Sequence, residues 1–211
     1  MKKFYILFMI CAIVACKGAK KIPNVDNINV NVEIVRFDKD IFSINDADIL
    51  REKYGSFFDN FCDFVIGVGT PDNVDFQDNF NSFRNDSIVL LAQNKAAEML
   101  NNYESTLNAD LTQAFKFYKY YFPENAIPQI YIYTSGFNHS LIIGENIIGI
   151  GMDKFLGSDE DIYKSLGFSN YLIQNMKKER IVCEVAGTVA VDKFPLENTH
   201  PTLIEKMIYE G

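Results

Sequence analysis

The stretch that decides the fold runs from Ile127 to Gly157 and reads IPQIYIYTSGFNHSLIIGENIIGIGMDKFLG. It holds two apolar runs rich in Ile and Tyr, Gln129–Tyr133 and Leu141–Ile150. Such residues suit the pleated, half-buried surface of a strand, and Ser-Gly-Phe-Asn at 135–138 is typical of a turn. Glu145-Asn146 interrupts the second run, which is therefore either two short strands or one strand with a bulge. The stretch predicts the centre of a small sheet.

Helical patterns precede and follow this sheet in the sequence. Val30–Phe37 alternates apolar and polar residues with period two and predicts a first strand. Asp46 suits the N-cap of a helix whose apolar residues recur every three or four positions as far as Val65. Further helices are predicted over Ile88–Tyr103, Leu107–Phe122, Tyr171–Lys193 and Thr202–Glu210. The Asn/Asp-rich segment Asp72–Asn85 is expected to be a loop. These patterns predict an α+β fold, with helices packed around a small mixed or antiparallel sheet.

Composition limits the classes of partner. The chain has 211 residues, of which 48% are hydrophobic, which is enough for one domain with a sizeable core. Its formal net charge of −8 argues against nucleic acid, because phosphate binding requires dense Lys and Arg, and it disfavours electrostatic attachment to anionic lipid. Of the four Cys, Cys62 and Cys183 lie far apart within the expected domain. We expect two buried thiols there rather than a bridge.

The N-terminus has the pattern of an export signal. Lys2 and Lys3 form a positive region, and the apolar segment Phe4–Ala15 is too short to span a bilayer as a permanent helix. It ends in Ile-Val-Ala-Cys at 13–16, which resembles the bacterial lipobox that precedes an acylated Cys. We therefore expect residues 1–15 to be a lipoprotein signal peptide and Cys16 to carry lipid. The alternative is a plain secretory signal cleaved near Cys16.

Acylation of Cys16 would hold the protein at a membrane. Two or three chains such as palmitate, at ~0.8 kcal/mol per buried CH₂, anchor a protein essentially permanently, so membrane contact is expected through the lipid and not the protein surface. Residues 16–31 are expected to form a lipidated tether, and residues 32–211 a single domain. Lys17–Lys20 lacks an acidic cluster resembling the surface-export signals of some bacteria, which favours a periplasm-facing anchor in the cell envelope. The choice between inner and outer membrane stays open.

Two helical segments near the C-terminus resemble part of a metallopeptidase. A gluzincin has a sheet, a helix bearing HExxH, and a second helix that supplies a Glu ligand to zinc. On this template Cys183 and Gly187 take the two His positions, and Glu184 takes the position of the general base. Glu210 takes the position of the third ligand.

These positions cannot assemble the peptidase site in its usual form. Gly187 has no side chain with which to bind a metal, and the two His of the chain, His139 and His200, lie outside the motif. The residues therefore indicate a degenerate site, with no catalytic residue, no metal ligand set and no cofactor.

Four segments carry a more specific resemblance. They are Tyr120–Pro123 (YYFP), Pro128–Phe137 (PQIYIYTSGF), Gly151–Gly157 (GMDKFLG) and Met207–Gly211 (MIYEG). Together with the lipobox they resemble the gliding-motility lipoprotein GldB family over nearly the whole chain. That family is related to predicted zinc peptidases but generally lacks their HExxH, so the resemblance implies a degenerate zincin-like (gluzincin-like) domain. Because the family continues beyond Gly211, the chain is expected to be truncated at its C-terminus.

The resemblance also implies a function. It implies a non-catalytic, membrane-anchored lipoprotein that gliding bacteria require, a scaffold or assembly component of the gliding apparatus. The implied partners are other gliding-machinery or type IX secretion proteins. Two alternatives remain open. One is an active envelope zinc metallopeptidase that uses Glu184 and recruits His139 or His200. The other is an unrelated envelope lipoprotein that binds a ligand in the cleft between sheet and helices.

Overall fold

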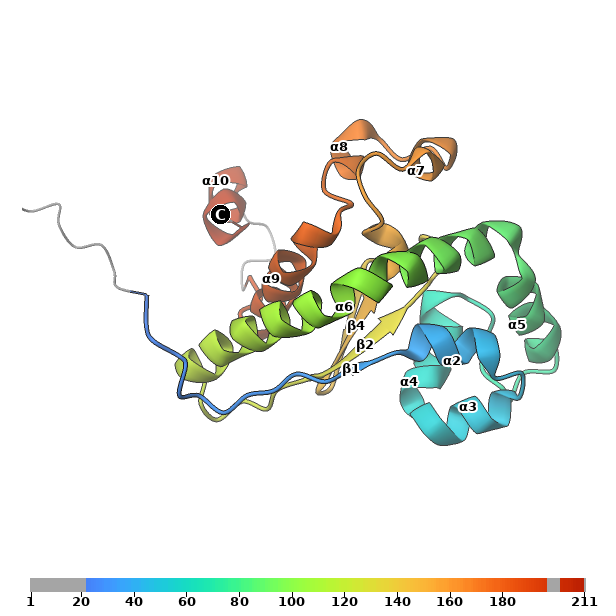
Figure 1. Ribbon diagram of the computed structural model, residues 1–211, viewed down its shortest axis with the longest axis horizontal. Coiled ribbons are helices and arrows are strands. Elements are labelled where there is room, and N and C mark those ends of the chain that lie inside the picture. Colours follow the sequence, from blue (N-terminus) through green and yellow to red (C-terminus); the bar gives the residue numbers. More distant parts are fainter. Residues whose placement is uncertain (1–21, 197–201, 211) are drawn as a thin grey trace, which may run out of the picture.

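The computed structural model describes residues 22–196 and 202–210, in which helices surround a mixed sheet of four strands (Figure 1). Strands β1 (Ile34–Val35), β2 (Gln129–Tyr133) and β4 (Ile147–Gly151) are parallel. Strand β3 (Leu141–Gly144) is antiparallel to β4, and the order is β1-β2-β4-β3. The predicted α+β class is confirmed. The second apolar run is two strands joined by a tight turn in which Asn146 adopts a φ of 58°.

The sheet separates two hydrophobic cores, because side chains of β2 alternate between its faces. Ile130 and Ile132 enter one core, and Tyr131 and Tyr133 enter the other. The helices that contribute to the first core are α6 (Ser87–Tyr121) and α9 (Ile181–Lys193). Those that contribute to the second are α2 (Phe37–Ser43), α3 (Ala47–Tyr54), α4 (Ser56–Asn60) and α5 (Phe76–Asn85). In Figure 1 the helices α2 to α5 form a separate cluster beyond one end of the sheet, and the N-terminal end of α6 reaches this cluster.

Two glycines of β4 make room for the ring of Tyr133. A Cβ at Gly149 would lie 2.8 Å from Cε1 of Tyr133, and a Cβ at Gly151 would lie 2.9 Å from Cε2. At Gly151 it would also lie 2.2 Å from the backbone oxygen of His139. The buried Tyr133 ring therefore depends on glycine at both positions.

The first predicted strand is much shorter than expected. Only Ile34 and Val35 pair with β2, and the chain enters α2 directly afterwards. Before β1, the backbone of Val32 uses side chains of α6 as partners: its N–H donates to Oγ1 of Thr112 (3.1 Å), and its carbonyl accepts from Asn108 (2.7 Å). This segment is thus bound to a helix, where a strand was predicted.

The two helices predicted over Ile88–Tyr103 and Leu107–Phe122 are one helix, α6, of 35 residues. Its N-cap is Asp86, whose side chain accepts from the N–H groups of Ile88 and Val89. The prediction of a break at Glu104–Thr106 was wrong because buried leucines continue the same apolar stripe past it. These leucines are Leu100, Leu107 and Leu111. Tertiary packing therefore overrides the weak helix preference of Ser and Thr.

The helix predicted from Asp46 to Val65 is divided. Asp46 caps α3 as predicted, accepting from the N–H of Asp48 at 2.9 Å. Gly55 then interrupts the helix with a φ of 55°, and α4 and the π-helix η1 (Phe61–Val65) follow. Gly55 is the local cause of the break, because a positive φ is incompatible with a helix.

The loop predicted over Asp72–Asn85 was also wrong, because the last 10 residues of this range are helix α5. Phe76 and Phe80, one turn apart, are both buried, and their rings stack 5.2 Å apart. Both rings contact Phe58 of α4. Burial of these rings stabilises a helix that the polar composition did not predict.

The C-terminal part is more divided than predicted. Its further elements are η2 (Met152–Lys154), α7 (Asp161–Ser165), α8 (Asn170–Ile173), η3 (Lys178–Arg180) and α10 (Leu203–Glu210). The helix predicted over Tyr171–Lys193 breaks after α8, because Met176 accepts a hydrogen bond from Gly157 and Lys177 bridges to Leu156. The predicted last helix is confirmed as α10. None of the described helices combines the length and apolarity needed to cross a bilayer.

Candidate functional site

Buried polar side chains collect where the parallel strands end. Parallel strands bring their carboxyl ends to one edge of a sheet, and polar residues lie within three positions after the ends of β1, β2 and β4. The buried ones are Asp38, Thr134, Ser135 and Asp153, together with Gln93 of α6. We call these five residues the polar cluster. Sequence reasoning assigned no role to any of them.

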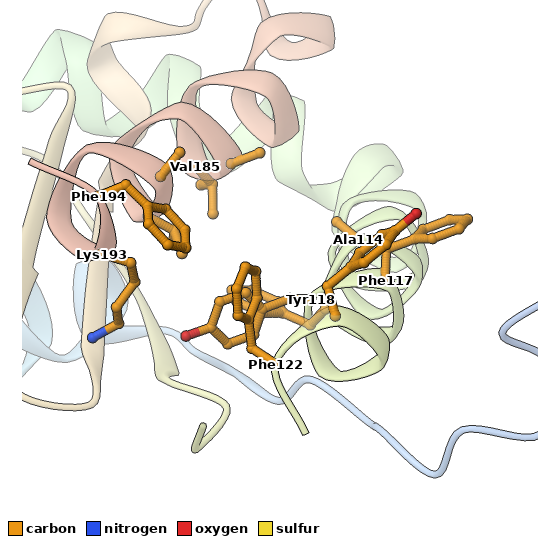
Figure 2. Close-up of a pocket in the computed structure, with 12 residues that line it drawn as sticks. Ala114, Phe117, Tyr118, Phe122, Val185, Lys193 and Phe194 are labelled. Atoms are coloured by element: carbon orange, nitrogen blue, oxygen red, sulfur yellow. The ribbon is translucent and has the colours of Figure 1, made fainter. Parts of the chain in front are cut away.

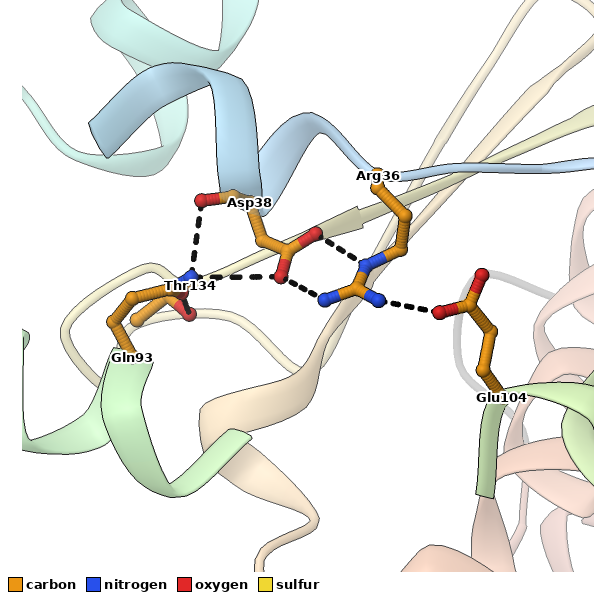
Figure 3. A network of polar contacts seen from close by, with 5 residues as sticks. All are labelled: Arg36, Asp38, Gln93, Glu104 and Thr134. Atoms are coloured by element: carbon orange, nitrogen blue, oxygen red, sulfur yellow. Dashed lines mark hydrogen bonds and ion pairs between the residues drawn. The ribbon is translucent and has the colours of Figure 1, made fainter. Parts of the chain in front are cut away.

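Asp38 of the polar cluster pairs with Arg36, which lies next to the cluster (Figure 3). Nε and Nη2 of Arg36 donate to the two carboxylate oxygens of Asp38 at 2.8 and 2.7 Å, and Nη1 donates to Glu104 of α6. The Asp38 side chain is fully buried, and that of Arg36 is 12% exposed. Burial alone would lower the pKa of Arg36, but the bonds to Asp38 and Glu104 raise it above its ordinary value. The guanidinium is therefore a permanent cation that joins the end of β1 to α6.

Gln93 continues the connection to β2. Its amide nitrogen donates to the backbone oxygen of Asp38 at 3.1 Å, and its oxygen accepts from Oγ1 of Thr134 at 2.6 Å. Figure 3 shows the Gln93 side chain reaching from α6 between these two partners. One helix side chain thus bridges the ends of two neighbouring strands.

Asp153 organises the turn that follows β2. One carboxylate oxygen accepts from the N–H of Ser135 (3.1 Å), the Oγ of Ser135 (3.2 Å) and the N–H of Phe137 (2.5 Å). Phe137 adopts a φ of 68°, rare for a bulky residue, and Lys154 donates to its carbonyl at 3.3 Å. The Tyr163 hydroxyl donates to the backbone carbonyl of Asp153 at 2.9 Å. The turn is held in this geometry by a residue of η2, the second residue after β4.

Burial sets the protonation of Asp153. Desolvation raises its pKa to about 6, although the hydrogen bonds from Phe137 and Ser135 act in the opposite direction. A carboxyl group with such a pKa could serve as a general base. The Asp153 side chain is nevertheless fully buried and one of its oxygens already accepts from three donors, so the arrangement suits fixing the strand ends better than transferring protons to a substrate.

The structure places the positions of the degenerate peptidase site on α9 and α10. Cys183 is an exposed free thiol, whereas Cys62 is buried, so the prediction of two buried thiols holds for Cys62 alone. Glu184 pairs with Arg180 at 3.4 Å. A Cβ at Gly187 would meet nothing within 4 Å. In the described residues, no three His, Cys, Asp or Glu side chains group closely enough to hold a metal ion.

The other predicted site residues are not joined to this group. His139 is exposed in the loop before β3, where its backbone oxygen accepts from the Tyr133 hydroxyl at 3.1 Å. Glu210 is the last residue of α10, and its side chain lies outside the described part. Cys16 and His200, together with the predicted signal peptide, lie outside the described residues.

An apolar pocket of about 240 Å³ opens between the C-terminal part of α6 and α9 (Figure 2). Aromatic rings contribute most of its α6 side, and small aliphatic side chains its α9 side. Its lining includes Phe115, Tyr118, Phe122, Val185, Val189 and Phe194. Lys193 adds a charged group, and Figure 2 shows it beside Phe194. Such a pocket suits an apolar ligand better than a polar substrate.

Comparison with known proteins gives one match. The family model described as gliding motility protein GldB, a lipoprotein family, matches residues 18–211. No curated protein and no solved structure matches the chain.

Proposed function

We propose that this chain, which belongs to the gliding motility protein GldB family, is a non-catalytic scaffold or assembly component of the gliding apparatus. The family assigns it a gliding-motility role and a place in the cell envelope. We propose further that its domain is a degenerate zincin-like domain, which has lost peptidase activity. It now holds together other proteins of the apparatus or of type IX secretion.

One observation carries the non-catalytic part of the proposal. On α9 the position of the second zinc ligand is Gly187, which has no side chain, and the position of the base is Glu184, which pairs with Arg180. A zinc peptidase needs a metal-bound water and a free carboxylate beside it. The polar cluster supports the scaffold part, because it fixes three strand ends and α6 into one rigid body.

The proposed attachment is through lipid. Residues 1–15 would be removed as a signal peptide, Cys16 would carry palmitate or a similar acyl group, and the domain would face the periplasm. The lipobox supports this proposal, and the lipoprotein character of the family agrees with it.

Complementation of a gliding strain that lacks its own copy of the gene tests this function. We expect the wild-type gene to restore spreading, the Glu184→Gln variant to restore it equally, and the Cys16→Ala variant to fail. Immunoblots must show equal amounts of all three proteins. Loss of spreading in Glu184→Gln at normal abundance would contradict a non-catalytic role, and normal spreading without any copy would contradict a role in gliding.

The pocket between α6 and α9 favours a second candidate, an envelope lipoprotein that binds an apolar ligand. Native mass spectrometry of the protein purified from its own envelope should then show a bound lipid-like molecule. The Ala190→Phe variant, whose larger side chain fills the pocket, should no longer carry this bound molecule. If nothing binds and Ala190→Phe glides normally, this candidate is eliminated.

A further inference from the structure

Large aromatic side chains are exposed where α6 and α9 end. Tyr120 and Tyr121 are 49% and 59% exposed, and Phe194, just after α9, is 53% exposed. Their rings are grouped: Tyr120 contacts Tyr121 at 5.1 Å between centroids, and Phe122 contacts Phe194 at 5.4 Å. We call these four residues the aromatic end. Grouped exposed apolar side chains of this kind mark a contact surface.

The described chain begins at this same end of the molecule. The segment from Ile22 to Val32 runs antiparallel to the C-terminal part of α6: Val32 bonds to Asn108 and Thr112, Ile28 packs against the first core, and Figure 1 shows the chain coming from beyond the C-terminal end of this helix. Figure 1 shows the first described residues beyond the C-terminal end of α6, with α2 to α5 at the opposite end of the long axis.

Covalent geometry then limits how far this end can lie from the lipid. The six residue steps from Cys16 to Ile22 span at most about 20 Å, whereas α6 alone is about 50 Å long. An anchor on Cys16 therefore keeps the aromatic end within reach of the bilayer, and the α2–α5 end cannot come equally close unless the whole domain lies flat.

The charges of the two ends fit the same orientation. Lys116 and Lys119 lie in the last turns of α6, and Lys193 ends α9 beside Phe194. The opposite end is rich in aspartate. Its acidic side chains include Asp46, Asp48, Asp72, Asp75 and Asp78. At the first end Asp110, Glu124 and Asp192 offset the lysines, and Asp192 pairs with Lys193 at 3.1 Å. A surface with anionic lipid therefore repels the second end more strongly than the first.

We propose that the aromatic end rests on the lipid bilayer, with the Tyr and Phe rings in the headgroup region, so that the protein contacts the membrane with its own surface as well as with its lipid. This rests on the proposed anchor at Cys16. Tyrosine suits such a position because its ring is apolar and its hydroxyl stays hydrated. Bilayer contact would cover the exposed parts of these apolar side chains.

The absence of Trp from the chain allows a direct test. Tyr121→Trp introduces the single Trp of the chain at the aromatic end, and Ile49→Trp introduces one at an exposed apolar position, 51% exposed, on α3 at the opposite end. The acylated mature chain from Cys16 is bound to phosphatidylethanolamine vesicles with or without brominated acyl chains. We expect the emission of the Tyr121→Trp variant to shift to shorter wavelength and to lose about half its intensity to brominated lipid, with no change in the Ile49→Trp variant.

Flotation of the same vesicles separates the two proposals. Protein that fails to float with the vesicles contradicts the lipid anchor. If the protein floats but brominated lipid does not change the emission of Tyr121→Trp, the proposed orientation is wrong and the lipid anchor is retained. Equal quenching of the Ile49→Trp and Tyr121→Trp variants also overturns it. If the emission of Tyr121→Trp instead shifts with protein concentration when no vesicles are present, a second copy of the chain covers the aromatic end and the proposed bilayer contact is wrong.

Discussion

At the scale of single residues, the buried ion pair of Arg36 and Asp38 is the most consequential contact. Arg36→Met leaves the fully buried Asp38 carboxylate without its cation, and we expect the free energy of unfolding to fall by about 3–5 kcal/mol. Urea unfolding followed by circular dichroism measures this change. The Lys164→Met variant is the control, because its pair with the 96% exposed Asp161 should contribute at most about 0.5 kcal/mol. Similar losses in both variants would show that burial of the pair has no special role.

Asp153 makes stability depend on pH. Its pKa of about 6 in the folded protein lies above that of an unfolded-chain carboxyl, about 3.9, so the folded state binds this proton more tightly. The stabilisation is complete below about pH 4 and is lost as the pH rises through 6. When the pH is lowered from 7 to 4, the free energy of unfolding of the wild type should rise by up to about 3 kcal/mol relative to that of Asp153→Asn, whose side chain does not titrate. Urea unfolding of both proteins across this range checks it, and parallel pH profiles would refute it.

At the scale of elements, two glycines differ in what surrounds them. In β4, a Cβ at Gly151 would lie 2.2 Å from the backbone oxygen of His139, which cannot move without displacing the loop before β3. We expect Gly151→Ala to destabilise the protein by at least about 3 kcal/mol or to prevent folding. In α9, Gly187 has open space, so Gly187→Ala should stabilise the helix by up to about 1 kcal/mol. Thermal unfolding of both variants distinguishes them, and equal effects would mean that the close approach at β4 is unimportant.

At the scale of the whole molecule, one thin sheet couples the two cores. Neighbouring residues of β2 enter opposite cores, so neither core can unfold without exposing the other. Phe37→Ala and Leu111→Ala, one in each core, should each destabilise the protein by about 2–5 kcal/mol. Hydrogen exchange should then accelerate in both halves whichever residue is changed. Acceleration confined to α2–α5 in Phe37→Ala would show that the cores unfold separately.

Features that depend on neighbouring residues were predictable from the amino-acid sequence. Alternating Ile and Tyr placed β2, the polar pair at Glu145-Asn146 indicated an interruption that was either a bulge or the turn now seen between β3 and β4, and Asp46 marked the start of α3. Family membership also followed from the sequence, because it rests on short motifs spread along the chain. Each of these signals is local, so no knowledge of distant contacts was needed.

Features that depend on distant contacts emerged only in the folded chain. Burial of leucines against the sheet makes α6 one helix, and stacked Phe rings stabilise α5 as a helix. At Val32, hydrogen bonds to two side chains of α6 replace the predicted strand pairing. The polar cluster follows the same rule, since Gln93 and Asp38 are 55 residues apart and Asp153 and Ser135 are 18 apart. Such pairs meet because parallel strands end at one edge of the sheet, and that pairing has no local signature in the sequence.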